Sequence, residues 1–286
     1  MTVIESENTF KKALADGINL FVGSGFSLLA EDGEGHHLPI GHQLLSELRD
    51  EFKIPDTQDL SLAQMCTILE SERKDQLYAF LKKRFAVQKF DVRYHVLESL
   101  NVRTIFTTNI DDLMFKIFAG SRSHYLNDLG TKGPAFTDRA AINYVALHGS
   151  IIHEGEPLEF TSTNLAAAFS IDPDKWHFLT AQIQKYPTLF WGYSLGDAGT
   201  LQALNPQTIK GRPHQDKWIA LNQPTEGDKR YFRALGFQII ESDSESLLHY
   251  LQGSLPAKPA RTSGSQIAYQ RLISRIHASV SRQCAR

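Results

Sequence analysis

The feature that most constrains the fold is an alternation of short apolar runs with stretches of helical periodicity. Six compact apolar runs each end in small or polar residues. They are residues 18–23, 103–109, 143–149, 188–194, 217–222 and 237–242. Runs of this kind are typical of parallel strands that are buried on both faces of a sheet. Because helical patterns fill the gaps between them, the sequence predicts an α/β fold.

The longest interval between two predicted strands, residues 41–100, contains no convincing strand. Apolar residues recur there at helical spacings. They are Leu62, Met65, Cys66, Leu69, Leu77, Phe80, Leu81 and Phe85. We therefore expect a Rossmann-like doubly wound parallel sheet with an all-helical insertion at about 41–100. Such an insertion can lie over the carboxyl ends of the strands, where open α/β sheets bind ligands.

The length and composition predict one main domain and a short C-terminal segment. The chain has 286 residues, of which 42% are hydrophobic, so it can bury a sizeable core. Gly, Pro and Ser accumulate at 253–266 and predict a linker. We expect the main domain over 1–253, and a linker with a basic amphipathic helix over 254–286. That helix either docks on its own domain or a sister subunit, or contacts an acidic partner or nucleic acid.

Charge is distributed unevenly along the chain. The net charge is −2, but residues 254–286 hold six basic residues and no acid, which leaves −8 for the remainder. An acidic body should repel nucleic acid, so binding of nucleic acid by the main domain is not expected. Only residues 254–286 are a candidate for contact with a polyanion.

The compartment and the metal content follow from the cysteines and the apolar runs. Cys66 and Cys284 give neither a disulfide framework nor paired metal ligands. No apolar run approaches the ~18 residues of a membrane span, and the N-terminus is polar. We expect a cytoplasmic protein without membrane contact. His36, His37 and His42 lie in a polar, glycine-rich stretch without cysteine, so we expect no metal site.

The first predicted strand runs directly into two closely spaced glycines. Gly23 and Gly25 remove side chains where backbone N–H groups can face a pyrophosphate, and Ser24 and Ser27 add hydroxyl donors. The third glycine of a dinucleotide-binding fingerprint is replaced by Leu28, so the motif alone is weak. A tight turn without any ligand is the alternative interpretation.

Polar side chains follow the later strands at the same predicted edge of the sheet. Asn109 and Asp111 follow the second strand, where a helix N-cap and an acidic first turn are the alternative explanation. His148 follows the third strand, and the ordinary pKa of histidine suits a general base. The fourth and fifth strands end in Gly192, Ser194 and Asn222. Five strand ends with small or polar residues at one edge are stronger evidence for a ligand site than any one of them alone.

The motifs GSGFS, TTNID, LHGS, GYSLGD and IALN, in this order, resemble those of the sirtuins and their bacterial sirtuin-like relatives. The resemblance spans roughly residues 12–245 and implies NAD as the ligand. It implies contacts to the NAD phosphates for Gly23, Ser24, Gly25 and Ser27. It implies contacts to the adenine-side ribose and phosphate for Gly192, Ser194 and Asn222. It implies catalytic roles for Asn109 at the reactive ribose and water, Asp111 beside the nicotinamide pocket, and His148 as the base.

Two departures from the sirtuin pattern bear on the reaction. Protein-deacylating sirtuins carry a zinc ribbon of four cysteines after the histidine-glycine motif, whereas residues 149–191 contain no cysteine. The stretch 38–48 retains Pro39 but lacks the acid and arginine that deacylases carry there. The zinc-free pattern resembles the sirtuin-like NAD hydrolases of bacterial antiphage defence, which also carry a helical insert.

The resemblance therefore implies an NAD glycohydrolase that yields nicotinamide and ADP-ribose or its cyclic form. Nicotinamide leaves NAD as a neutral molecule, so the cleavage does not need a general acid. Depletion of NAD would halt an infected cell, and such an effector needs regulation, through a homo-oligomer or a separately encoded sensor protein. The alternatives are an NAD-dependent protein deacylase and a non-catalytic nucleotide-binding subunit that scaffolds an assembly.

Overall fold

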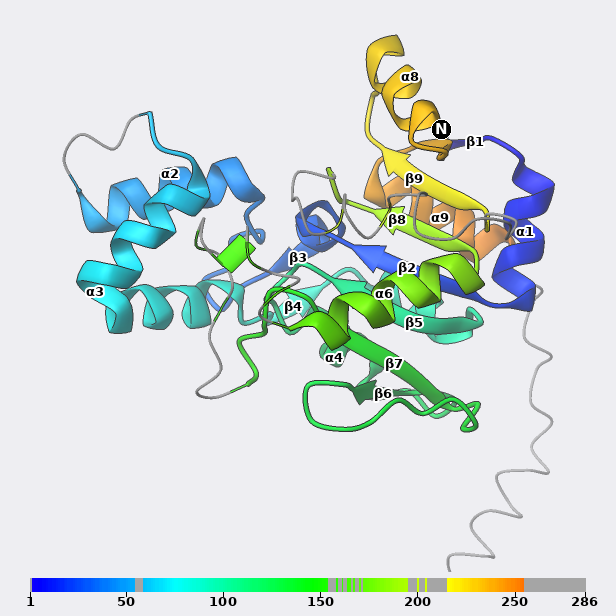
Figure 1. The fold of residues 1–286 in the computed structure, drawn as a ribbon, viewed down its shortest axis with the longest axis horizontal. Helices are drawn as coiled ribbons and strands as arrows, with labels where there is room; N and C mark the ends of the chain where they lie inside the picture. The colour runs from blue at the N-terminus through cyan, green and yellow to red at the C-terminus, as the bar shows by residue number, and fades with distance from the viewer. Residues whose placement is uncertain are drawn as a thin grey trace, which may run out of the picture. The chain divides into compact units, whose positions relative to one another are not determined.

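The computed structural model describes residues 2–54, 59–153, 172–194 and 215–254, together with single positions between these ranges. Its centre is a sheet with the strand order β1-β10-β9-β8-β2-β5-β7-β6 (Figure 1). In that order the strands are Val3–Ile4, Gln238–Glu241, Lys217–Leu221, Thr188–Trp191, Ile18–Val22, Val102–Thr107, Ala141–Ala146 and Tyr125–Asp128. Every neighbouring pair is parallel except β1 on β10.

The chain winds outward from β2 in two directions, first through β5 and β7 and later through β8, β9 and β10. This confirms the prediction of a Rossmann-like doubly wound α/β fold, and the six predicted strands are all present. β2 is buried at all five positions, as a central parallel strand should be. The order reverses around β2, so the carboxyl ends of β2, β5 and β8 form the crevice where such sheets bind ligands.

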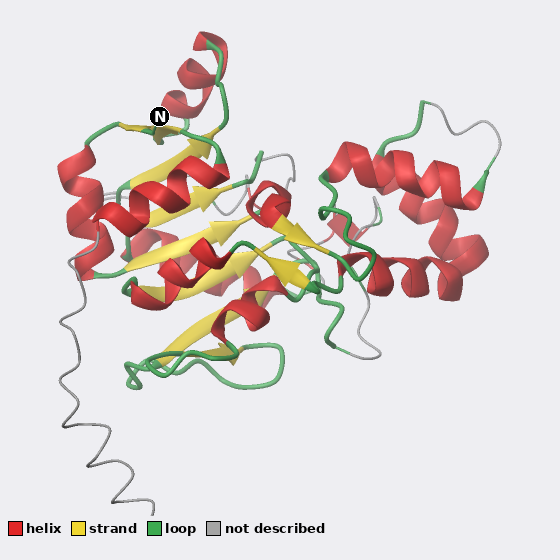
Figure 2. Cartoon of the chain, turned by 180° about the vertical axis from the view of Figure 1, so that it is seen from behind, coloured by secondary structure: helices red, strands yellow, loops and turns green. Residues whose placement is uncertain are grey.

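Helices cover both faces of the sheet (Figures 1 and 2). α6 (Pro173–Lys185) and α8 (Glu226–Ala234) pack on one face around a core that includes Trp176, Phe106 and Phe190. Further helical segments of the described chain are α1 (Glu7–Asp16), α4 (Leu113–Phe118), α9 (Ser244–Ser254) and the 3₁₀-helices η1 (Ser24–Leu29) and η2 (Val92–Ser99). The N-cap Asp172, which accepts a hydrogen bond from Lys175 N, begins α6, as its Asp-Pro sequence predicts.

The described residues of the predicted insertion form α2 (Gly41–Phe52), α3 (Leu62–Phe85) and the 3₁₀-helix η2. Ser61 and Gln64 form a capping box at the start of α3, and Arg73 interrupts the helix with non-helical dihedral angles. The apolar positions of helical spacing form a separate core with Leu44, Leu48 and Phe52. One difference from the sequence expectation is a two-residue strand, β4 (Lys89–Phe90), which pairs with β3 (Ala30–Glu31).

Two further observations concern membrane-spanning helices and the C-terminal segment of the chain. No helix in the described part of the chain is long and apolar enough to cross a membrane. The chain separates into two compact units at Ser254, and the second unit, with the predicted linker and C-terminal helix, lies outside the described residues.

Candidate functional site

A cavity of about 280 Å³ lies at the carboxyl edge of the sheet, between the strand ends and the helical insertion. Seven of the ten predicted site residues line it. They are Ser24, Ser27, Asn109, Asp111, His148, Gly192 and Ser194. The structure therefore brings together side chains from four strand ends that lie far apart in the sequence. The roles that the sequence predicts for them at NAD stay predictions.

Asn109, directly after β5, is held in one orientation by its amide nitrogen. Its Nδ2 donates to the carbonyl oxygen of Gly23 at 2.9 Å and to Ser27 Oγ at 3.0 Å. Its backbone N–H donates to Thr107 Oγ1 at 2.9 Å. Because both amide protons are used, the side chain has only its Oδ1 acceptor left for a ligand. An acceptor at this place suits a ribose hydroxyl or a water molecule.

Ser27 connects Asn109 to a buried carboxylate. Ser27 Oγ donates to Asp111 Oδ2 at 2.8 Å while it accepts the hydrogen bond from Asn109. Asp111 Oδ1 accepts from Leu113 N at 3.1 Å. Burial raises the pKa of Asp111 to about 6, and the two hydrogen bonds from Ser27 and Leu113 oppose that rise. The carboxylate is therefore ionised at neutral pH and protonated in moderate acid.

His148 stands at the end of β7 and lines the same cavity. Its side chain is buried, with 8% of its surface exposed. The preceding residue, Leu147, extends the pairing of β7 with β5 through its N–H, which donates to Thr107 O at 2.7 Å. The next residue, Gly149, has φ +82°, a conformation that favours glycine and turns the chain away from the sheet. The strand end therefore fixes where the imidazole can lie.

The glycines of the first and fourth strand ends pack against each other. Gly25 N donates to Gly192 O at 2.9 Å, and a Cβ on Gly23 would lie 2.6 Å from that oxygen. Gly192 has φ +66°, and its Cβ would lie 2.0 Å from Phe26 N. Contact between the two loops thus explains all three glycines without a ligand. Gly23 and Gly25 do not line the cavity, and their predicted contacts with phosphate stay predictions.

Asn222 lies apart from these residues. It follows β9, is exposed, and is not among the residues that line the cavity. β8 separates β9 from β2 in the sheet, so Asn222 is two strands away from the glycine loop. Its predicted contact with the adenosine ribose stays a prediction.

The sequence did not identify the apolar side of the cavity. Leu44 of α2 and Leu62 and Phe85 of α3 line it, opposite the polar strand ends. Their helical spacing indicated burial but not which neighbour they face. Tyr193 also lines the cavity, and its ring packs 4.8 Å from Phe21. Its position inside the GYSLGD motif was the one available signal. Among the described residues there is no group of His, Cys, Asp or Glu that could hold a metal ion.

The fold and the position of the cavity define a doubly wound α/β protein with a site at the carboxyl edge of its sheet. Within that class, residues 103–240 match the family model of the SIR2-like domain. The match includes the strand ends that carry Asn109, Asp111 and His148, and it begins after the glycine motif. It spans slightly less than half of the chain. No curated protein matches the chain.

Solved structures align with most of the chain at low identity. A Sir2 homologue in complex with ADP-ribose covers 88% of this chain and 96% of its own, with 11% identity and a TM-score of 0.49. A structure on the mechanism and regulation of Sir2 enzymes covers 87% and 97%, with 13% identity and a TM-score of 0.46. A cytosolic 5′-nucleotidase bound to cytidine covers 88% and 93%, with 9% identity and a TM-score of 0.39. Overlaps of this size say nothing about the ligand of this chain.

Proposed function

We propose that the protein is an NAD glycohydrolase that cleaves NAD to nicotinamide and ADP-ribose. The observation that carries the proposal is the hydrogen-bonded series Asn109, Ser27 and Asp111 at the base of a cavity that His148 also lines. The match of residues 103–240 to the SIR2-like domain supports NAD as the ligand. The remaining hydroxyls of the cavity, on Ser24 and Ser194, supply donors for the rest of the substrate.

The reaction breaks the bond between C1′ of the ribose and the ring nitrogen of nicotinamide. The electron pair of that bond returns to the ring nitrogen, which neutralises the positive charge of the ring. Water then bonds to C1′, and His148 takes the proton that the water releases. Asn109 Oδ1 accepts a hydrogen bond from the ribose or the water and so holds them in line. The ionised Asp111 favours the positive charge that develops on the ribose.

The helical insertion supplies the other requirement, which is control of solvent. Leu44, Leu62 and Phe85 contribute apolar surface to the cavity that Asn109 and His148 line. An apolar wall limits access of bulk water and strengthens the electrostatic interactions inside the cavity. A protein deacylase remains the alternative reaction for a SIR2-like domain. The absence of cysteine between 149 and 191, and hence of a zinc ribbon, favours the hydrolase.

We extend the proposal to the biological role that the zinc-free sequence pattern implies. The protein acts as an NAD-depleting effector in bacterial antiphage defence, and a homo-oligomer or a separately encoded sensor controls it. Cells that carry the chain with its genomic neighbour should lose NAD after phage challenge. Unchanged NAD in challenged cells would remove this role while leaving the enzymatic proposal intact.

The decisive experiment measures the release of free nicotinamide after NAD is added to the purified protein. The assay is run with and without the product of the neighbouring gene, and with and without an acylated peptide. We expect release without the peptide, and a fall of about 100-fold or more in kcat for Asn109→Ala and His148→Ala. Asn101→Ala, at the other end of β5, and His95→Ala, on η2, are matched controls at exposed positions. Release that requires the peptide would indicate a deacylase, and NAD that binds without turnover would indicate a scaffold subunit.

A further inference from the structure

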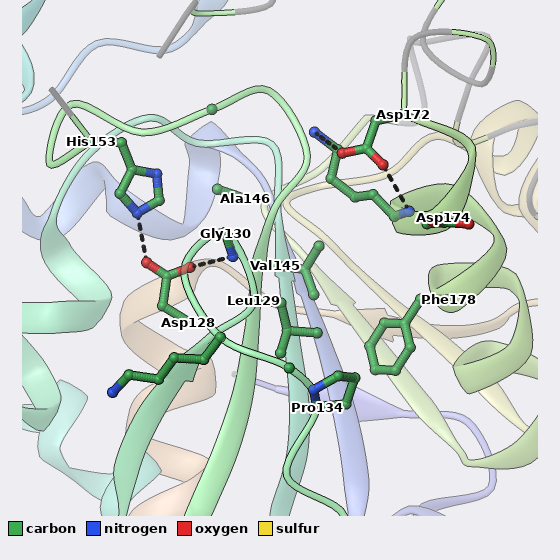
Figure 3. Close-up of a pocket in the computed structure, with 14 residues that line it drawn as sticks. Asp128, Leu129, Gly130, Pro134, Val145, Ala146, His153, Asp172, Asp174 and Phe178 are labelled. Carbon is green, nitrogen blue, oxygen red and sulfur yellow. Dashed lines mark hydrogen bonds and ion pairs between the residues drawn. The ribbon is translucent and has the colours of Figure 1, made fainter. Parts of the chain in front are cut away.

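A second cavity, of about 640 Å³, lies beside the end of β7, where Val145 and Ala146 line it (Figure 3). Gly149, which follows His148 in the sequence, also lines it. Its walls come from the loop after β6, the carboxyl end of β7 and the first turns of α6. It is larger than the cavity that holds Asn109, and none of the described residues lines both cavities. Its volume is within the range of sites for small organic ligands, roughly 300–1,000 Å³.

The floor of this second cavity is apolar and contains a fixed aromatic ring. Leu129, Val145, Pro134 and Phe178 form it, and Figure 3 shows the first two between the polar sides. The Phe178 ring packs 5.9 Å from Phe106, between ring centroids, and belongs to the edge of the main core. A ring held in this way offers a face on which a planar group can stack.

Polar groups stand on two opposite sides of that floor (Figure 3). On one side Asp128 Oδ2 lies 2.6 Å from His153 Nε2. On the other side Asp172 accepts from Lys175 N at 3.1 Å, and Asp174 is exposed beside it. Among the described residues that line the cavity there are three carboxylates and two lysines, and the third basic group, His153, is paired with Asp128. This excess disfavours a ligand with a phosphate group, whereas carboxylates are good acceptors for the vicinal hydroxyls of a ribose.

Gly133 is the position at which this cavity can be narrowed without disturbing the fold. It lines the cavity, its φ is not positive, and a Cβ there would meet no atom within 4 Å. Neither backbone conformation nor close packing therefore requires glycine at this position. The space beside Gly133 is open, so a larger side chain can occupy it without a clash and reduce the volume of the cavity.

We propose that the second cavity binds a nucleoside without a 5′-phosphate. The base stacks against the side of the cavity that holds Phe178, and the ribose hydroxyls donate to a lining carboxylate. This proposal stands apart from the cleavage of NAD, because none of its residues lines the cavity of Asn109 and His148.

Calorimetric titration of the full chain with adenosine, guanosine, cytidine and uridine tests the proposal. We expect at least one of them to bind with a Kd below about 1 mM, and its 5′-monophosphate to bind about tenfold more weakly or less. Gly133→Leu should raise the Kd of that nucleoside by about tenfold or more. Gly120→Leu is the matched control, since a Cβ at Gly120 also meets nothing within 4 Å and Gly120 does not line this cavity.

A second variant gives a test that does not depend on filling the cavity. Asp174→Asn removes one negative charge and should narrow the difference between the nucleoside and its monophosphate. The proposal is overturned if no nucleoside binds, or if the monophosphate binds as tightly as the nucleoside. It is also overturned if Gly133→Leu leaves the affinity unchanged, because the nucleoside then occupies another place.

Discussion

The protonation of Asp111 is the residue-level property that links the site to the stability of the fold. The carboxyl group is buried, and desolvation raises its pKa to about 6 from an ordinary value of 3.8. Between these two values the unfolded chain releases the proton while the folded chain keeps it. Stability therefore falls as pH rises through this window and stays constant above it. The ionised Asp111 next to Ser27 therefore lowers the free energy of unfolding at neutral pH.

We predict that Asp111→Asn is more stable than the natural chain at pH 7.5, because the amide cannot ionise. The difference in free energy of unfolding between the two proteins should grow by about 2 kcal/mol from pH 4 to pH 7. Urea unfolding at four pH values within this range measures it. A difference that is independent of pH would show that Asp111 titrates alike in both states.

Asp138→Asn provides a control of opposite sign. Backbone hydrogen bonding by Ala140 and the hydroxyl of Tyr125 lower the pKa of Asp138, which is exposed. Its carboxylate therefore stabilises the fold above the pKa of the unfolded chain, and this contribution is lost as pH falls. At neutral pH the Asp138→Asn variant should accordingly be less stable than the natural chain, and this difference in free energy of unfolding should disappear in acid. The Asp111→Asn variant should be more stable at neutral pH, and that difference should disappear in acid as well.

The sequence predicted which side chains gather at the site but not how they are connected. Asn109, Asp111 and His148 were found because strand ends of a parallel sheet meet at one edge. Ser27 bonds to Asn109, which lies 82 positions later in the sequence, and to Asp111, which lies 84 positions later. No local sequence pattern predicts a contact over such a separation. For the same reason the packing of Gly23 on Gly192 was visible only in three dimensions.

At the scale of elements, the loop between β5 and α4 belongs to the site and to the insertion at once. Asn109 and Asp111 bind the glycine loop, whereas Ile110 packs into the core of the insertion. Asp112 Oδ1 accepts a hydrogen bond from Val87 N, just after α3, at 2.7 Å. Alternate residues therefore attach the loop to the glycine loop on one side and to the helical insertion on the other. A displacement of α3 would therefore shift Asn109.

We predict that Asp112→Ala lowers kcat for the proposed reaction by about tenfold while changing KM little, because it frees the end of α3 from the loop that carries Asn109. Leaving the N–H of the buried Val87 without an acceptor should also cost about 1–3 kcal/mol of stability. Asp112→Asn retains the Oδ1 acceptor and should keep most of kcat. Equal kcat in the Ala and Asn variants would show that the contact does not position the loop.

Most elements were predictable because each has a strong local pattern. The differences concern short elements. β1 has two residues and pairs with β10 at the edge, and β6, with the sequence Tyr-Leu-Asn-Asp, has no apolar run. The segment after the first glycine motif is a 3₁₀-helix, η1, whose geometry depends on its contact with Gly192. These features depend on tertiary neighbours, which periodicity does not encode.

At the scale of the whole molecule, the two hydrophobic cores that the described residues form lie within residues 2–254. The last described helix, α9, contributes Leu247, Leu248 and Leu251, all of which are fully buried. The segment that follows holds six basic residues and no acid, and the preceding part of the chain has a net charge of −8. The information for folding and the information for association can therefore reside in different parts of the chain.

We predict that a chain ending at Ser254 keeps the thermal unfolding midpoint within about 2 °C, because it retains every residue of both cores. It should lose the self-association proposed for the full chain, since the removed segment carries the apolar stripe and the basic charge that complement an acidic body. Light scattering with size-exclusion chromatography gives the mass, and calorimetry gives the midpoint. An oligomer that survives the truncation would assign assembly to the α/β domain. A large drop in the midpoint would mean that the segment packs on its own domain instead.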